Sequence, residues 1–270
     1  MAQLIPQNFF KGSTRRINMV SFRDRPICPC GDFPWKGYYW ERQPPKNYDF
    51  EQNYWQQPVD PDGNKRTPMQ ERKKKLKEHK EVLKFINNLS PGSILDVGCG
   101  LGFTLSGVNN NWDKYGTEVS DIAAKFAEKY ARIYKNNLLE YNFPRYFFRA
   151  VLMLHTLRYV NKPRQHISEI YRLLYPGGVF IISEADYDSG CARKFKKKYR
   201  LLHDKAATNL FSTHSLIKLL EDEGFTILKI EHPFFDTEHF TKENLLRLFN
   251  GNKTSPPFYG NTVTIYAIKD

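Results

Sequence analysis

Three glycines that follow directly on a short apolar segment constrain the fold of this chain more than any other feature. Residues 93–97 predict a buried strand, and Gly98, Gly100 and Gly102 come next, at the start of a predicted helix over 101–109. Because glycine has no Cβ, the backbone can turn sharply here and approach a ligand closely. The N–H groups at the start of the helix then face that ligand. The junction predicts an α/β domain with a ligand site at its first strand-to-helix crevice.

The rest of the chain alternates between strand and helix patterns, which is typical of a parallel sheet with helices on both faces. Apolar runs predict strands over 93–97, 114–118, 150–154, 179–183, 226–231 and 262–268, with a further strand near 136–139. Helical spacing predicts helices over 71–88, 101–109, 121–134, 164–174 and 213–222. We expect a doubly wound, mostly parallel seven-stranded sheet of the Rossmann-like kind, closed by an antiparallel edge.

Residues 1–68 have a different character from the remainder. Nine prolines interrupt any helix or central strand there, and aromatic residues lie between them. Disordered tails are usually poor in aromatic residues, so we expect an irregular N-terminal arm that packs on the domain; a wall of a substrate pocket is the alternative. The predicted division is an arm over 1–68 and a domain over 69–270, in which 187–211 form a basic insertion on the substrate side.

Charge and hydropathy limit the class of protein. The net charge of +12, from 41 basic and 29 acidic residues, indicates an anionic partner such as nucleic acid, an acidic glycan or a membrane surface. The mean hydropathy is −0.61, and no run approaches the roughly 18–20 apolar residues of a membrane span. Residues 1–10 lack the pattern of a secretory signal. We therefore expect a cytoplasmic protein.

The four cysteines do not form a pattern typical of a disulfide framework. Cys99 lies in the glycine loop and Cys191 in a basic segment. Cys28 and Cys30 could be half of a metal site, but no second pair completes four thiolates. Free thiols are the favoured interpretation, and no metal is predicted.

Two features narrow the ligand of the glycine loop. Position 103, where a dinucleotide-binding loop has its third glycine, is Phe103. Glu118 ends the next predicted strand, where a carboxylate can accept hydrogen bonds from both hydroxyls of a ribose; a solvated strand end is the alternative. The pattern predicts a nucleoside-bearing ligand that need not carry a phosphate.

The motifs, in their order along residues 82–270, resemble the class I S-adenosylmethionine-dependent methyltransferases. The segment Asp96-Val-Gly-Cys-Gly-Leu-Gly is similar to the DxGxGxG signature of that family, and Glu118 matches its ribose-binding acid. The resemblance implies S-adenosyl-L-methionine as cofactor. The cofactor-binding residues that it implies are Asp96, Gly98, Cys99, Gly100, Gly102, Glu118, Val119, Asn137, Leu138 and Leu154.

The catalytic side departs from the family pattern. Phe148 and Arg149 stand where the family commonly has an aspartate, and Arg158 and Tyr159 replace a frequent Glu-His pair. These changes leave open a protein that keeps the fold without the activity.

Methyl transfer needs alignment of the reacting atoms, and a hydroxyl acceptor also needs a base. His155, just past the predicted strand 150–154, is the first candidate and Tyr159 the second, with Glu184 and Asp186 behind them. For His155, a structural role in the loop is an equal alternative.

Three functions fit these observations. The first is a methyltransferase for a small-molecule or glycan acceptor, at oxygen, with the arm and the insertion forming a lid. The second is an RNA methyltransferase that uses the basic clusters at 72–80 and 193–200. The third is a binding protein with the same fold and no catalysis. The oligomeric state is not predicted.

Overall fold

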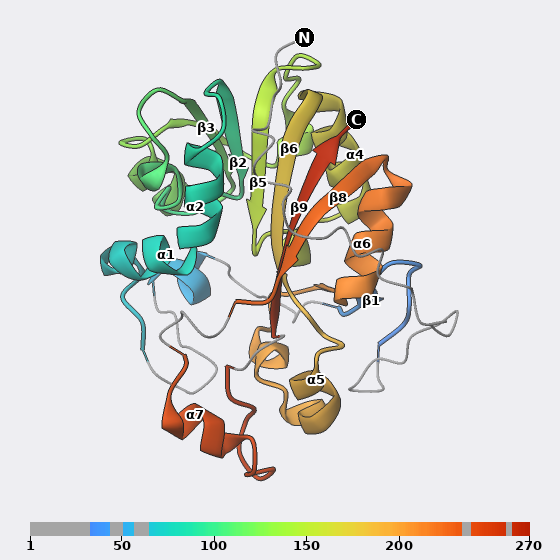
Figure 1. The fold of residues 1–270 in the computed structure, drawn as a ribbon. Helices are drawn as coiled ribbons and strands as arrows, with labels where there is room; N and C mark the ends of the chain where they lie inside the picture. Colours follow the sequence, from blue (N-terminus) through green and yellow to red (C-terminus); the bar gives the residue numbers. More distant parts are fainter. Residues whose placement is uncertain (1–32, 44–50, 57–64, 234–238, 258–260) are drawn as a thin grey trace.

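The computed structural model of the protein describes residues 33–43, 51–56, 65–233, 239–257 and 261–270. Its centre is a seven-stranded sheet in which five parallel strands are followed by an antiparallel pair (Figure 1). In spatial order the strands are β4 (Arg132–Lys135), β3 (Asp113–Glu118), β2 (Ser93–Val97), β5 (Phe148–Leu154), β6 (Leu174–Ala185), β9 (Thr262–Lys269) and β8 (Phe225–Glu231). The predicted fold class, a doubly wound α/β sheet with an antiparallel edge, is confirmed.

Helices cover both faces of the sheet because successive strand residues point to opposite sides. On one face, Val151 and Met153 of β5 pack in a cluster with α4 (Pro163–Leu173) and α6 (Thr213–Asp222), while Ala150 and Leu152 on the other face pack with α2 (Lys80–Asn87). The helices are α1 (Arg72–Glu78), α2 (Lys80–Asn87), α3 (Asp121–Ala127), α4 (Pro163–Leu173), α5 (Gly190–Phe195), α6 (Thr213–Asp222) and α7 (Lys242–Arg247). The carboxyl ends of the parallel strands point toward the side on which α1, α5 and α7 lie (Figure 1). The glycine loop after β2 and Glu118 at the end of β3 lie at that edge.

Three predicted elements between β2 and β5 were wrong in extent or kind. The predicted helix 101–109 is a series of turns with one 3₁₀ turn, Leu105–Gly107, because Gly102 has a φ of +70° that no right-handed helix accepts. The predicted helix 121–134 ends at Ala127. The chain then forms β4, so the strand lies at 132–135, ahead of the predicted 136–139.

The predicted helix over 71–88 is divided at His79. Its backbone (φ −96°, ψ 17°) ends α1, and α2 begins at the next residue. His79 is 8% exposed although it lies between helices with many lysines. The break brings Nδ1 of His79 within 2.8 Å of the hydroxyl of Thr104, two residues past Gly102.

The described part of the arm packs on the domain. Its strand β1 (Trp40–Glu41) pairs antiparallel with β7 (Asn209–Leu210), and Trp40 is 1% exposed. The guanidinium of Arg42 donates to the carbonyls of Ala207 and Leu202. The arm and the 187–211 insertion therefore support each other, while the boundary at residue 68 stays a prediction.

None of the helices in the described ranges is long and apolar enough to cross a bilayer. Cys28 and Cys30 lie outside the described residues, and the two described cysteines, Cys99 and Cys191, are both free thiols.

Candidate active site

The glycine loop turns back over the carboxyl end of β2 through residues in the left-handed region. The φ angles are +70° at Gly98, +54° at Gly100 and +70° at Gly102, which L side chains rarely adopt. The amides of Gly98 and Cys99 donate to the carbonyl of Thr117 on β3, at 2.9 and 3.0 Å. The turn is therefore fastened to the neighbouring strand.

The loop also lacks room for larger side chains. A Cβ on Gly98 would lie 2.4 Å from the Thr156 side chain, and one on Gly102 would lie 3.0 Å from the Cβ of Ala127. The Cys99 thiol packs directly on Gly116, where an added Cβ would lie 2.7 Å from Sγ. Burial raises the pKa of this thiol well above its ordinary value. Cys99 is thus a small, protonated residue that packs inside the loop of residues 98–102, the glycine cradle.

Replacing Gly102 by alanine is expected to lower the free energy of unfolding by about 1–3 kcal/mol, the usual cost of a strained backbone position. Urea denaturation would measure it. Gly251→Ala is the matched control, because nothing lies within 4 Å of its added Cβ, and it should change stability little. Gly37→Ala, at a φ of +89° with open space, isolates the backbone contribution. Equal costs at positions 102 and 251 would contradict the argument.

Glu118, at the end of β3, faces the loop across the crevice. It is 5% exposed, and its Oε2 accepts from the amide of Gly100 at 2.8 Å, while Oε1 accepts from the amide of Ser120 at 2.9 Å. Burial raises the pKa of this carboxyl, and the backbone donors act in the opposite direction. Each carboxylate oxygen keeps acceptor capacity for a hydroxyl entering the cavity.

A second buried carboxyl, Asp96, lies on β2 two residues before Gly98. Burial, followed by the charge of Glu118, raises the pKa of Asp96 to about 8. At neutral pH Asp96 is therefore mostly protonated and offers a donor where Glu118 offers acceptors.

The next wall comes from the segment after β4. Asn137 accepts from the amide of Leu139 at 3.0 Å, and its Oδ1 lies 2.8 Å from Nε2 of His166 on α4. Leu138 is buried beside it, and Val119 is 57% exposed at the rim. His166, which the sequence analysis did not select, holds the Asn137 side chain in place.

All these walls enclose one cavity of about 450 Å³, a size typical of small-molecule sites. The residues from the sequence prediction that line it are Asp96, Gly98, Cys99, Gly100, Glu118, Val119, Asn137, Leu138, Leu154, His155 and Tyr159. Gly102 does not line it and packs on α3 instead. Glu184 and Asp186 are buried outside its lining.

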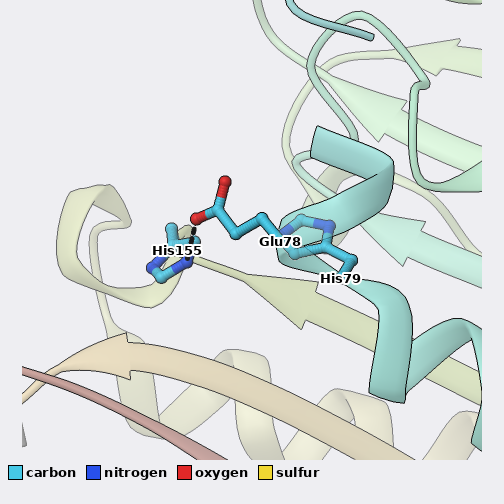
Figure 2. A group of neighbouring side chains, drawn as sticks. All are labelled: Glu78, His79 and His155. Carbon is cyan, nitrogen blue, oxygen red and sulfur yellow. Dashed lines mark ion pairs between the residues drawn. The ribbon is translucent and has the colours of Figure 1, made fainter. Parts of the chain in front are cut away.

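His155, just past the end of β5, forms one group of lining residues with Arg66, Glu71, Lys75 and His79, and the glycine loop, Glu118, Asn137 and Leu138 form the other group. The φ of His155 is +61°, and its amide donates to the carbonyl of Ser183 at 2.7 Å. The guanidinium of Arg158 donates to Nδ1 at 2.8 Å, so the ring proton of neutral His155 is on Nε2, which lies 3.6 Å from Oε1 of Glu78 (Figure 2). Burial lowers the pKa of His155, which keeps it neutral.

His79 lies beside that pair, its ring stacked on His155 with centroids 6.3 Å apart. Its Nδ1 is 2.8 Å from the hydroxyl of Thr104, while Nε2 is buried and has no hydrogen-bond partner among the described residues. Burial lowers the pKa of His79 from 6.5 to about 3. His79 therefore presents an uncharged ring with one uncommitted nitrogen.

Glu78, His79 and His155 form a group whose ligand atoms lie within 4.8 Å of one another (Figure 2). A metal-binding histidine normally donates its second N–H to an acceptor. At His155 that position faces Arg158, which only donates, and the Lys75 ammonium lies 2.8 Å from Glu78. The geometry favours a hydrogen-bonded cluster over a cation site, and the absence of a metal stays a prediction.

Arg158 and Tyr159, the departures from the family pattern, have defined partners. Arg158 is 6% exposed and donates from Nε to Glu184, which is 1% exposed, at 2.8 Å. The Tyr159 hydroxyl donates to Asp204 at 2.5 Å, and burial raises its pKa well above the ordinary value. This geometry suits Tyr159 as an aromatic wall; a catalytic role for it stays a prediction.

Several cavity residues were missed by sequence reasoning. They are Arg66, Glu71, Lys75, His79, Thr156 and His166, whereas Tyr54 and Trp55 belong to the arm, for which a pocket wall was the alternative interpretation. One signal was available: His79 continues the apolar stripe of Leu76, Leu83 and Ile86 at helical spacing, which is an unusual place for a histidine. Of the others, Lys75 and His166 lie on α1 and α4, where helical spacing does not single them out as cavity residues, and Arg66, Glu71 and Thr156 lie in segments without periodicity.

The uncharged state of His79 has a consequence for acid stability. Its folded pKa is below that of the unfolded chain, so the unfolded state takes up the proton first as the pH falls from 6.5 toward about 3. We expect about 2 kcal/mol of unfolding free energy to be lost from this group by about pH 5. Urea titrations of wild type and His79→Gln across this range measure it: the stability difference between them should shift by that amount. Parallel curves would exclude a neutral, buried His79.

Comparison with known proteins adds a family and a fold. A family model described as a methyltransferase domain matches residues 69–230. The chain is 28% identical over 167 residues to a sterol 24-C-methyltransferase of Yarrowia lipolytica, covering 55% of this chain and 43% of that protein. It is also 28% identical over 158 residues to an uncharacterized protein of Methanocaldococcus jannaschii, covering 57% and 74%. The chain thus spans less than half the length of the sterol methyltransferase that it matches.

Solved structures share the architecture. A SAM-dependent methyltransferase of Thermotoga maritima aligns with a TM-score of 0.54 at 22% identity, over 74% of this chain and 91% of that one. A geranyl diphosphate C-methyltransferase of Streptomyces coelicolor, solved with Mg²⁺, geranyl diphosphate and S-adenosyl-L-homocysteine, aligns with 0.54 at 17% identity, over 72% and 80%. At these identities the likeness is one of fold.

Proposed function

Since the chain belongs to the methyltransferase domain family, we propose that it transfers the methyl group of S-adenosyl-L-methionine to a small hydroxyl-bearing acceptor. The observation that carries the proposal is the single cavity in which the glycine cradle and Glu118 share a space with His79 and His155. One half of the cavity suits an adenosyl ligand and the other half is polar enough for an acceptor.

The residues of the first half fit the cofactor. The close contacts at Gly98 and the positive φ angles keep the loop free of side chains, so backbone can approach a ligand. Glu118 would accept from the ribose hydroxyls, and Asn137 and Leu138 would border the adenine. Protonated Asp96 would supply a donor beneath the methionyl part.

When bound, S-adenosyl-L-methionine supplies a methyl group on a positively charged sulfur. The chain's own contribution is to exclude water and to hold the acceptor oxygen in line, which accounts for much of the rate in such displacements. A hydroxyl must also lose its proton. In the tautomer whose Nδ1 donates to Thr104, Nε2 of His79 can accept a hydrogen bond from the acceptor hydroxyl, but a pKa of about 3 makes it a weak base. The N–H that His155 points toward Glu78 is suited to orienting the acceptor.

The polar half of the cavity supports oxygen as the acceptor atom. Arg66, Glu71, Lys75, His79 and His155 line it. A hydrocarbon acceptor would offer no partner to Nε2 of His79 and would desolvate the Arg66–Glu71 and Lys75–Glu78 ion pairs, which is costly. The names of the relatives, sterol and geranyl diphosphate methyltransferases, favour carbon instead. An acceptor screen must therefore include both hydroxyl compounds and polar isoprenoids.

An RNA acceptor is the second candidate, favoured by charge. Helix α1 contributes Lys75 to the cavity lining, and the residue before the helix, Glu71, also lines the cavity. The same helix carries four exposed basic residues, Arg72, Lys73, Lys74 and Lys77. Affinity for RNA should fall steeply as salt rises, whereas affinity for a small neutral acceptor should not.

The test is calorimetry with S-adenosyl-L-homocysteine, followed by incubation with S-adenosyl-L-methionine and pools of hydroxyl compounds, glycans, isoprenoids and RNA. We expect saturable binding and a mass gain of one methylene in a hydroxyl compound. Methylated carbon would move the acceptor assignment to the isoprenoid class. Absence of S-adenosyl-L-homocysteine binding by the folded protein would overturn the proposal.

A further inference from the structure

A segment of the N-terminal arm, Glu51–Gln56, lies against the loop that carries Glu118. This segment is a single helical turn, and the carboxylate of Glu51 accepts from the Ser120 hydroxyl at 2.8 Å and from the Asp121 amide at 2.6 Å. Ser120 donates its own amide to Glu118. One residue therefore joins the arm to the carboxylate that faces the cofactor half of the cavity.

The other end of the segment lies on the glycine cradle. A Cβ added to Gly100 would come within 3.0 Å of the Trp55 ring, and that ring packs beside Leu101 and Phe103. Trp55 lines the cavity together with Tyr54, whose ring contacts both Trp55 and Tyr159. The arm thus covers the cofactor half with Trp55 and reaches the acceptor half with Tyr54.

These contacts close into a ring around the crevice. Trp55 lies on Gly100, the amide of Gly100 donates to Glu118, and Glu118 also accepts from the amide of Ser120. The hydroxyl of Ser120 donates to Glu51, which belongs to the same arm segment as Trp55. A ligand that engages Glu118 and Gly100 therefore acts on both ends of the arm segment. Occupation of the crevice and docking of the arm should stabilise each other, as linkage requires.

One group of this segment lacks the partner that burial demands. The Nε1 atom of Trp55 is shielded from solvent and has no hydrogen-bond partner in the described part of the chain. An indole N–H can only donate, and leaving such a group buried without an acceptor is costly. Because Trp55 lines the cavity, an acceptor atom on a bound ligand can satisfy it.

We propose that Glu51 and Trp55 make the arm a third wall of the cofactor site: Glu51 latches the segment to the start of α3, and the indole N–H of Trp55 donates to the bound adenosyl ligand. This inference rests on the proposed function for the identity of that ligand. With these contacts the arm takes part in ligand binding. An arm that only packed on the domain would leave the affinity for the ligand unchanged.

The experiment compares S-adenosyl-L-homocysteine affinity by calorimetry in wild type, Trp55→Phe, Trp55→Ala and Glu51→Ala. Trp55→Phe keeps a ring and removes only the N–H, so we expect affinity to fall about 5–10-fold, the value of one hydrogen bond. Trp55→Ala also removes the cover and should lose more. Glu51→Ala should lose affinity although Glu51 itself does not line the cavity.

Matched controls separate binding from general damage. Trp112→Phe makes the same change at a buried tryptophan outside this cavity, and Glu128→Ala removes an exposed carboxylate just past α3. Both should bind as wild type does. Hydrogen exchange of residues 51–56 provides a readout beyond affinity: S-adenosyl-L-homocysteine should slow exchange there in wild type and much less in Glu51→Ala.

The outcomes distinguish this inference from the proposed function. If wild type binds and the three variants bind equally well, with no ligand-dependent protection of 51–56, the arm is only packed and the inference is wrong. If folded wild type does not bind S-adenosyl-L-homocysteine, the proposed function fails first.

Discussion

Glu118→Ala is expected to weaken S-adenosyl-L-homocysteine binding by at least about 100-fold while the protein stays folded. Two hydrogen bonds from ligand hydroxyls to a carboxylate are each worth about 1.5–3 kcal/mol, and the variant also leaves the amides of Gly100 and Ser120 without their acceptor. Calorimetry measures the affinity. Glu118→Gln, which keeps one acceptor oxygen, should fall between wild type and alanine.

Glu140→Ala is the matched control for that measurement. Glu140 is also an acidic residue of the cavity lining, but it is exposed, and it should affect affinity only slightly. Equal binding by wild type and Glu118→Ala would remove Glu118 from the ligand site and leave it a structural anchor of the loop.

Glu184→Ala should destabilise the protein by about 3–5 kcal/mol, because it strands the buried guanidinium of Arg158. Arg158 is 6% exposed, and its charged partner is the carboxylate of Glu184, 2.8 Å from Nε. The nearby Asp204 carboxylate, which accepts from the Tyr159 hydroxyl, does not replace a direct contact. Urea denaturation measures the loss.

Two controls define that prediction. The double variant Arg158→Met with Glu184→Leu removes both charges and should regain much of the lost stability. Asp188→Ala breaks an ion pair with Arg193, whose side chain is 62% exposed. This variant should lose less than about 1 kcal/mol of unfolding free energy. A small loss in Glu184→Ala would mean that Arg158 finds water or another acceptor.

Much of the cofactor half of the cavity could be predicted from the sequence because its chemistry is local. Three glycines in five residues fix the turn, and a carboxylate at the end of the next strand must lie across from it, since neighbouring parallel strands end at the same edge. The strand patterns were equally informative, because burial on both faces leaves continuous apolar runs such as Ala150–Leu154.

The errors came from segments where a local pattern competes with tertiary contacts. Helical spacing extended the predicted helix through Tyr134, yet the chain leaves α3 at Ala127 so that 132–135 can pair with β3. The predicted helix after the loop gave way to turns because Gly102 has to pack on Ala127. Local propensity is a weak guide where strand pairing or close packing decides.

By itself the sequence determined the sheet, the glycine turn and the acid opposite it, because each depends on residues near in sequence or on strand order. Only the tertiary structure decided the other half of the site. Bringing Trp55 onto Gly100, or His79 beside His155, joins residues 45 and 76 positions apart, and the hydrogen bond from Arg158 settled which ring nitrogen of His155 carries the proton. Such contacts follow from packing in three dimensions, which has no period along the chain.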